Sequence, residues 1–334
     1  MPVLFWSHIL FVVSLDFELF WGVHDVRGPE YFPNIKNVHN VVPALLNLFE
    51  VYGVKSTWAT VGLIGLNSKD ELAESSIALE KPTYNDSQYS PFANGTVDYA
   101  QDDMLFGPKL IQKIIESELT ELASHTLSHF YVLEDGQTSR QFDDDCYHTR
   151  LIFQEKYSRA PKSIVFPRNQ VNKNYFALLE MHGITGFRGT PKHWAYKTES
   201  RSERSVLRRL YRLLDCYLPI TQDFGCRVEK QVDHDLYDVP ATLFLRPYSK
   251  TLRFIEPLKI WRLKYAMKRA AKKGEIFHLW WHPHNFSANT DMNLKNLKKI
   301  LDYYQILSRK YSWHSYKMEE VVKEFRDEKD SSIR

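Results

Sequence analysis

Residues 9–18 read ILFVVSLDFE, a run of apolar side chains that ends directly in two carboxylates, Asp16 and Glu18. A continuous apolar run of this length, rich in β-branched residues, is typical of a strand that is buried on both faces. Such strands occur in parallel sheets that helices cover on both sides. We therefore predict a first strand at residues 9–15.

The same stretch raises the question of an export signal, because residues 3–15 are mostly apolar. Signal peptides have a basic amino-terminal region and a small-residue cleavage site, and residues 3–15 have neither. Ser7 and His8 also interrupt the apolar run, which is too short to cross a bilayer as a helix. We expect a strand here and a cytoplasmic protein.

Apolar runs and helical patterns alternate along the rest of the chain, which indicates parallel strands joined by crossover helices. Further strands are predicted at residues 56–61, 119–124, 163–166, 185–187 and 275–281. Helices are predicted at residues 38–52, 106–117, 139–157, 173–182, 203–214, 259–273, 291–310 and 317–327. The sequence thus predicts a single α/β domain over residues 1–334, with insertions at about 66–104 and 190–250.

The composition excludes several classes of protein. With 43% hydrophobic and 25% charged residues, 13 Gly and 15 Pro, the chain is neither collagen-like nor disordered. Cys146, Cys216 and Cys226 form an odd set without a C-x-x-C pair, which argues against a disulfide framework or a thiolate zinc site. The cysteine usage favours a reducing compartment.

Basic residues gather in two segments although the net charge is only +3. Residues 192–212 hold seven Lys or Arg against two Glu, and residues 250–273 hold nine against one Glu. Two interpretations stay open: these are solvated faces of ordinary helices, or they contact phosphates or acidic lipid.

Three groups of residues follow predicted strands and can carry chemistry. His125 and His129, in the sequence HTLSH, are four residues apart and would share one face of a helical turn, so that both reach one metal ion. Asp16 and Glu18 are two residues apart on a strand and point to one side. His282 ends the strand at 275–281, where an α/β barrel places catalytic groups. Each group alone also fits an ordinary structural role.

Taken in order, these groups resemble the motifs of the polysaccharide deacetylase family, also called carbohydrate esterase family 4 or the NodB-homology domain. The matching stretches are SLDFE at 14–18, STWATVG at 56–62, HTLSH at 125–129 and LWWH at 279–282. The similarity spans roughly residues 9–325. It implies a distorted (β/α)7-type barrel with inserted loops and basic helices.

The resemblance also implies roles for individual residues. One divalent metal ion would be held by Glu18, His125 and His129, with Asp16 as general base and His282 as general acid. Zinc is the first expectation, and Fe, Co, Ni and Mn also accept nitrogen and oxygen ligands. The implied reaction is metal-dependent N-deacetylation of an N-acylated amino sugar.

Two departures from the family pattern affect these roles. The adjacent aspartates of the first motif are Asp16 and Glu18 here, which leaves open which carboxylate binds the metal. The third motif has its arginine before the proline, whereas Arg168 follows Pro167; we expect Arg168 to hold Asp16 by a charge-assisted hydrogen bond. The family's Asp-Trp motif is not evident, and Arg188 stands in its neighbourhood.

Substrate contacts are expected from residues beside the motifs, namely Trp21, His24, Arg188 and Trp281. Tryptophan rings stack on sugars, although aromatic side chains next to a barrel strand are also common in the core. Because no export signal is evident, the expected substrate is intracellular: a nucleotide-linked or lipid-diphosphate-linked precursor of a surface polysaccharide. Its diphosphate would give the basic helices a partner, and peripheral contact with an anionic membrane is the other interpretation.

Other functions stay open at this point. A nucleic-acid partner is not expected, because the basic residues form no recognised binding motif. A second possible enzyme function is that of an amidohydrolase acting on a non-sugar amide or cyclic ureide. The altered first and third motifs would also fit a carbohydrate-binding protein that has lost catalysis.

Overall fold

The computed structural model describes residues 10–74, 80–93, 95–198, 200, 205–222, 224 and 226–333. Its centre is a sheet with the strand order β6-β7-β5-β4-β3-β2-β1-β9-β8, and β10 pairs with β1 as well. Every pairing is parallel except that of β6 with β7. No pairing between described residues joins β8 to β6, so the barrel is open on that side.

The strands are short except for β1. They span β1 Leu10–Phe17, β2 Ser56–Thr60, β3 Thr120–Ser124, β4 Ser163–Ile164, β5 Gly186–Phe187, β6 Glu229–Lys230, β7 Tyr237–Asp238, β8 Leu243–Phe244, β9 Phe277–Trp281 and β10 His314–Tyr316. All eight residues of β1 are buried. The predicted α/β fold with a distorted barrel is therefore confirmed.

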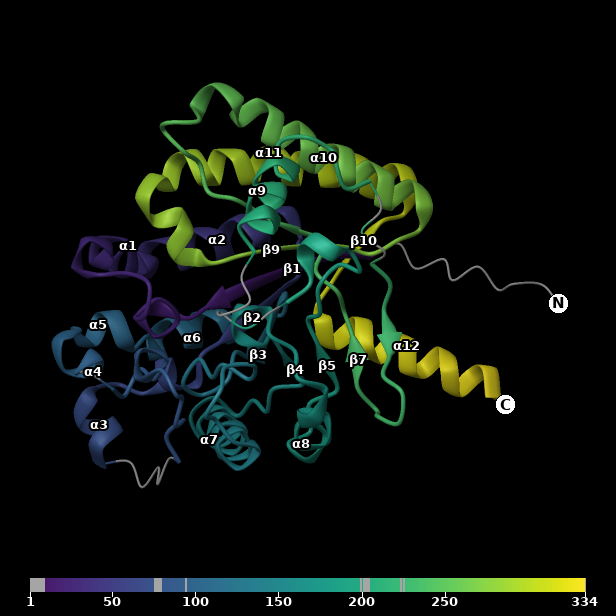
Figure 1. Ribbon diagram of the computed structural model, residues 1–334. Coiled ribbons are helices and arrows are strands. Elements are labelled where there is room, and N and C mark those ends of the chain that lie inside the picture. The colour runs from purple at the N-terminus through teal and green to yellow at the C-terminus, as the bar shows by residue number, and fades with distance from the viewer. Residues whose placement is uncertain are drawn as a thin grey trace.

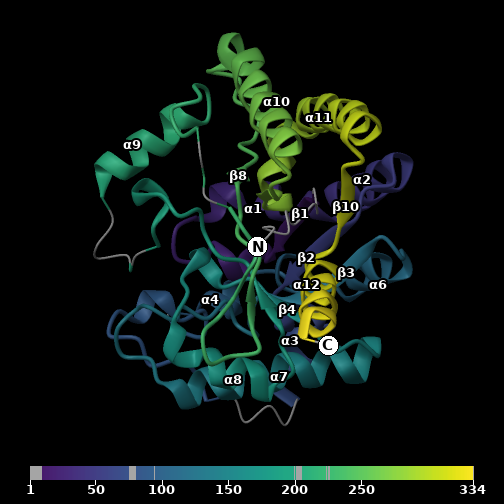
Figure 2. The same cartoon turned by 90° about the vertical axis from the view of Figure 1, so that its right-hand side faces the viewer.

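Helices cover the outside of the sheet, as Figures 1 and 2 show. They span α1 Phe32–Lys36, α2 Val38–Tyr52, α3 Lys69–Glu74, α4 Thr96–Tyr99, α5 Asp102–Leu105, α6 Pro108–Glu116, α7 Ser139–Tyr157, α8 Phe176–Met181, α9 Val206–Asp215, α10 Glu256–Lys273, α11 Thr290–Tyr311 and α12 Met318–Ile333. In the described part of the chain, no helix has an apolar stretch long enough to cross a membrane.

Local signals set most of these boundaries. Gly53 ends α2 with φ 59°, a left-handed conformation that glycine adopts without strain. Thr138 and Gln141 form a capping box at the start of α7, which satisfies two backbone N–H groups that the helix leaves free. The predictions at 38–52 and 139–157 are confirmed with the same bounds.

Other predictions need adjustment. The first strand continues two residues further than predicted, to Phe17, because Asp16 pairs in register with Ala59 of β2. Residue 9 and residues 203–204, at the ends of two predicted elements, lie outside the described residues. Strand β10 was not predicted. The segments 66–104 and 190–250 hold α3 to α5 and α9 with β6 to β8, and their status as insertions in one domain stays a prediction.

The pairing of β1 explains why the functional motifs converge. The strand lies between β2 and β9, and its carboxyl end is level with theirs: Phe17 pairs with Thr60, and Leu15 with Trp281. Because the strands are parallel, the residues that follow them emerge at one edge of the sheet. The motifs after β1, β3, β4, β5 and β9 therefore share one end of the barrel.

Candidate metal centre and active site

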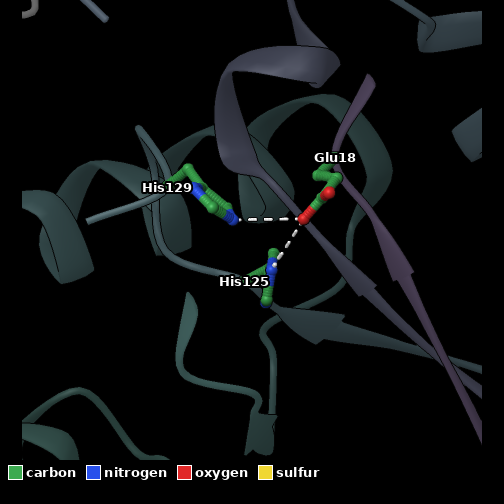
Figure 3. A group of neighbouring side chains, drawn as sticks. All are labelled: Glu18, His125 and His129. Atoms are coloured by element: carbon green, nitrogen blue, oxygen red, sulfur yellow. Dashed lines mark ion pairs between the residues drawn. The ribbon is translucent and has the colours of Figure 1, made fainter. Parts of the chain in front are cut away.

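Glu18, His125 and His129 meet at this end of the barrel (Figure 3). Glu18 follows β1, His125 directly follows β3, and His129 lies four residues further on. The Nε2 atoms of His125 and His129 lie 3.3 and 3.1 Å from the same oxygen, Oε2 of Glu18. All three residues are buried, and their ligand atoms lie within 4.8 Å of one another. Two imidazoles and one carboxylate are a donor set typical of catalytic zinc.

The prediction that a helical turn brings the two histidines together was wrong. Residues 125–129 form a loop, in which Thr126 and His129 are left-handed with φ 64° and 60°. Such values are uncommon for residues other than glycine and persist where the surroundings enforce them. Here the Thr126 hydroxyl accepts a hydrogen bond from the Phe130 N–H at 2.7 Å.

Asp145 of α7 stabilises this loop by hydrogen bonds. Its carboxylate accepts hydrogen bonds from the Leu127 N–H at 2.5 Å and from the Ser128 N–H and hydroxyl at 3.1 and 2.9 Å. Burial raises the pKa of Asp145 to about 7 despite these bonds. The sequence analysis missed this residue, whose only signal was an acidic residue on the apolar side of a predicted helix.

The imidazole of His125 is oriented as a metal ligand requires. Its Nδ1 donates to the Val165 carbonyl oxygen at 2.7 Å, which leaves Nε2 as the lone-pair atom that faces Glu18. That Nε2 is buried and has no hydrogen-bond partner among the described residues. Burial lowers the pKa of His129 to about 4, so the His129 ring is neutral near pH 7. An orphaned, buried nitrogen lone pair beside a carboxylate fits a divalent cation.

Glu18 sits over the backbone of a short 3-10 helix, Leu19–Gly22. A Cβ atom at Gly22 would lie 2.1 Å from the carboxyl carbon of Glu18, so only glycine leaves space for this side chain. Burial raises the pKa of Glu18, but the charge of His282 and the close contacts of His125 and His129 with the carboxylate outweigh it and leave the pKa well below its ordinary value.

Asp16 is held by Arg188, which directly follows β5. Two parallel hydrogen bonds join them: Nη1 to Oδ1 at 2.6 Å and Nη2 to Oδ2 at 2.8 Å. Burial raises the pKa of Asp16, but the Arg188 charge outweighs it and the pKa is lowered. Arg188 also donates to Ser14 and Asn169, and it stacks on the Trp280 ring. Asp16 is thus a charged carboxylate of fixed orientation.

This arrangement corrects two predictions. Arg168 does not hold Asp16; its guanidinium pairs with Asp25 and lies 3.8 Å from the ring centre of Tyr131. Arg188 is fully buried and fully used by its partners, so it does not face the substrate as predicted. Arg188, directly after β5, therefore holds Asp16, whereas Arg168, four residues after β4, lines the cavity.

The structure does not bring the other predicted substrate contacts, Trp21, His24 and Trp281, to the cavity. Trp21 is 1% exposed and donates to the Leu105 carbonyl, and Trp281 is fully buried against Phe286. His24 is largely buried, and its Nδ1 contacts the Trp21 carbonyl oxygen at 2.8 Å. None of the three lines the cavity at the site, whereas Trp280, the neighbour of Trp281 on the opposite face of β9, does.

His282 follows β9 and faces the two carboxylates. Its Nε2 lies 3.6 Å from Oδ2 of Asp16 and 3.7 Å from Oε1 of Glu18. The Asn285 side-chain amide contacts Nδ1 at 3.2 Å, which leaves Nε2 as the ring nitrogen that faces the two carboxylates. The side chain of His282 is 23% exposed, unlike the more buried ligands, and it lines the cavity. His282 is therefore placed to deliver a proton into the site.

A cavity of about 570 Å³ opens over these residues. One end is lined by Asp16, Glu18, His129 and His282. The cavity continues along Trp280 and Phe244 to residues of the 190–250 segment. A volume of this size holds a ligand of several rings rather than one small acyl compound.

The fold and the site define an α/β barrel with a candidate metal centre and a carboxylate at the carboxyl ends of its strands. Residues 28–187 match the family model of polysaccharide deacetylases, which confirms the resemblance that the motifs indicated. The match includes His125 and His129 but ends before Arg188 and His282. No curated protein sequence is significantly similar to the chain.

Solved structures show the same fold. A putative polysaccharide deacetylase from Mycobacterium smegmatis superposes with a TM-score of 0.61 at 11% identity, covering 96% of this chain and 91% of that one. A probable polysaccharide deacetylase from Pseudomonas aeruginosa PAO1 gives 0.54 at 13% identity, covering 96% and 92%. A Puue allantoinase gives 0.51 at 11% identity, covering 90% and 85%. At these identities the likeness concerns the fold alone.

Proposed function

We propose that the protein is a metal-dependent N-deacetylase that hydrolyses the amide of an N-acylated amino sugar. One observation carries the proposal: a buried Glu18–His125–His129 cluster lies beside the charged carboxylate of Asp16 and the imidazole of His282. The family of residues 28–187 supports a carbohydrate as the substrate. A silent binding protein would not need the paired Asp16 and Arg188 next to a metal cluster.

Glu18, His125 and His129 would hold the metal ion, for which zinc is our first choice and Fe, Co, Ni or Mn the alternatives. A bound divalent ion supplies polarisation of the acyl oxygen and a lower pKa for water. Glu18, in contact with both histidines, is the ligand carboxylate. Both carboxylate oxygens of Asp16 accept hydrogen bonds from Arg188, and a lone pair remains free to accept a proton.

The remaining groups move protons. Asp16 accepts the proton of the attacking water, since its charged state is maintained by Arg188. The protonated, imidazolium form of His282 donates its Nε2 proton to the departing amine and returns to neutral imidazole, the step without which the C–N bond does not break. Each transfer is typically worth ~10²–10⁴ in rate. The products are a free amino sugar and the carboxylate of the acyl group.

The finer identity of the substrate is also a proposal. We favour a sugar linked to a diphosphate, as in nucleotide-linked or lipid-linked precursors of surface polysaccharides. The cytoplasmic location and the contact with an anionic membrane stay predictions, and the second is supported by α9, whose Val206, Leu207 and Leu210 are exposed beside arginines. Cell fractionation and flotation with anionic vesicles test them.

The function is tested by metal analysis together with acetate release from N-acetylated sugars. His125→Ala and His129→Ala should each lose both bound metal and turnover, because each removes one of three ligands. His182→Ala, a histidine that pairs with Asp143 on α7, is the matched control and should retain both. Full activity in a metal-free His125→Ala/His129→Ala double variant would contradict the proposal.

A further inference from the structure

The cavity over the active site has a second, strongly basic end. Lys197, Arg209, Arg212 and Arg246 line it together with Ser205 and Thr198. The acidic residues in the lining are Asp16 and Glu18, both at the metal end. Among the described residues, the charged side chains that line the cavity away from the metal end are therefore all basic.

Three of these four cations, Arg212 left aside, have no carboxylate partner among the described residues. Among the residues that the structure describes, no carboxylate oxygen lies within 4.0 Å of Lys197, Arg209 or Arg246. Neighbouring carboxylates are already committed: Asp215 is buried against Arg262 at 3.2 Å, and Glu256 pairs with Lys259 at 2.7 Å. Like charges on one cavity wall repel one another, and a bound anion removes that repulsion.

The positions of the cations point to a phosphate-bearing ligand. Arg246 is half-buried, two residues beyond the end of β8, and Arg209 lines the same cavity from α9. The planar guanidinium group donates two parallel hydrogen bonds to phosphate oxygens, which a single ammonium does not. Two arginines from separate elements suit an anion with more than one phosphate.

We infer that this basic end is a subsite for the diphosphate of an N-acylated sugar diphosphate, with the sugar extending to the metal end. The inference rests on the proposed function and names the substrate class of the same cavity. Trp280 and Phe244 line the path between the two ends and would contact the sugar. Helix α10, the second basic segment of the sequence, contributes no residue to the cavity lining.

Calorimetric titration of the metal-loaded protein with UDP tests the subsite without any turnover. UDP should bind, uridine should not, and Arg209→Gln and Arg246→Gln should each weaken UDP binding about tenfold or more. Lys268→Gln, on the exposed side of α10 and outside the cavity, is the control and should bind like the wild type. Farnesyl diphosphate, titrated in parallel, distinguishes a lipid carrier from a nucleotide by its relative affinity.

Two results overturn the inference: neither diphosphate binds the wild type, or both arginine variants bind them as the wild type does. Acetate release from a neutral methyl glycoside of an N-acetylated amino sugar separates this failure from failure of the proposed function. If the wild type hydrolyses the glycoside but binds no diphosphate, the proposed deacetylase function stands and the diphosphate subsite is excluded. If UDP binds in an arginine-dependent way but no acylated sugar is hydrolysed, the subsite stands and the proposed deacetylase function is excluded.

Discussion

At the carboxyl end of the sheet, Asp16 and Glu18 are buried next to an arginine and imidazoles, whereas at the amino end Glu121 of β3 is buried with no described cation beside it. Asp16, Glu18 and Glu121 are each 3% exposed. Glu121 accepts hydrogen bonds from the Thr57 hydroxyl at 2.7 Å and the Glu319 N–H at 3.1 Å. Its other carboxyl oxygen has no partner among the described residues.

The three carboxyl groups are equally buried, but the pKa of Glu121 shifts in the opposite direction to those of Asp16 and Glu18. Burial, reinforced by the nearby Glu319 carboxylate, raises the pKa of Glu121 to about 7. At the other end, the Arg188 charge lowers the pKa of Asp16 although burial opposes it. Desolvation of the charged form acts on all three carboxyls, so the charge of the partner decides which of them stays ionised. The carboxyl end of the sheet therefore keeps its carboxylates ionised, whereas burial at the amino end favours the neutral form of Glu121.

The largest effect is expected from Arg188→Ala, which removes the difference between the two ends. Asp16 would then be buried without a cation, and its pKa would rise as that of Glu121 does. We expect the acidic limb of the kcat/KM profile to move to higher pH and activity at pH 7 to fall ~10²–10⁴-fold. Unfolding should also become easier by ~3–5 kcal/mol, as measured by denaturant titration.

Arg168→Ala is the matched comparison, because it makes the same change in the arginine that pairs with Asp25. The acidic limb should stay in place in this variant. A shift of equal size in both variants would show that Arg188 has no special relation to Asp16.

An intermediate effect is expected from Gly22→Ala. This substitution retains all three metal-ligand residues but displaces the side chain of Glu18. The added Cβ would meet the Glu18 carboxyl carbon at 2.1 Å and push the carboxylate out of its place. We expect metal affinity to fall by ~10–100-fold, the range typical of changes in residues that orient metal ligands. Competition with a chelator measures it.

Gly28→Ala in the same loop serves as the control, since its added Cβ would meet only the end of the exposed Glu30 side chain. Its metal affinity should equal that of the wild type. Unchanged affinity in Gly22→Ala would mean that Glu18 is not a ligand in the position described.

The smallest effect is expected from Glu121→Gln and concerns stability alone. The native pKa of Glu121, about 7, lies above the ordinary value of 4.5, so the folded protein binds the extra proton between these values. The contribution of this group to the free energy of unfolding is therefore full below about pH 4.5 and is lost as the pH rises to about 7. Because glutamine does not ionise, Glu121→Gln removes this pH-dependent loss of stability.

Denaturant titrations at pH 5 and pH 8 check this prediction. Relative to the wild type, Glu121→Gln should gain roughly 1–3 kcal/mol at pH 8 compared with pH 5, with turnover unchanged at both. The same pH dependence in wild type and variant would exclude a neutral Glu121.

Much of the fold follows from local sequence patterns. The helices at 38–52 and 139–157 begin and end at residues with capping or turn chemistry, so their bounds were predictable. Strand β10 was not, because its three residues pair with β1 from the far end of the chain and carry no alternating pattern. The short β6, β7 and β8 have the same property.

For the site, the sequence by itself determined which side chains follow strands, and this was sufficient to select Asp16, Glu18, His125, His129 and His282 as neighbours. The tertiary structure alone decided how they are paired: Arg188 rather than Arg168 on Asp16, and Trp280 rather than Trp281 in the cavity. The physical reason is that a motif fixes the element on which a side chain stands. Its charge partner is set by strand register and by the side of the sheet, which depend on residues more than a hundred positions away.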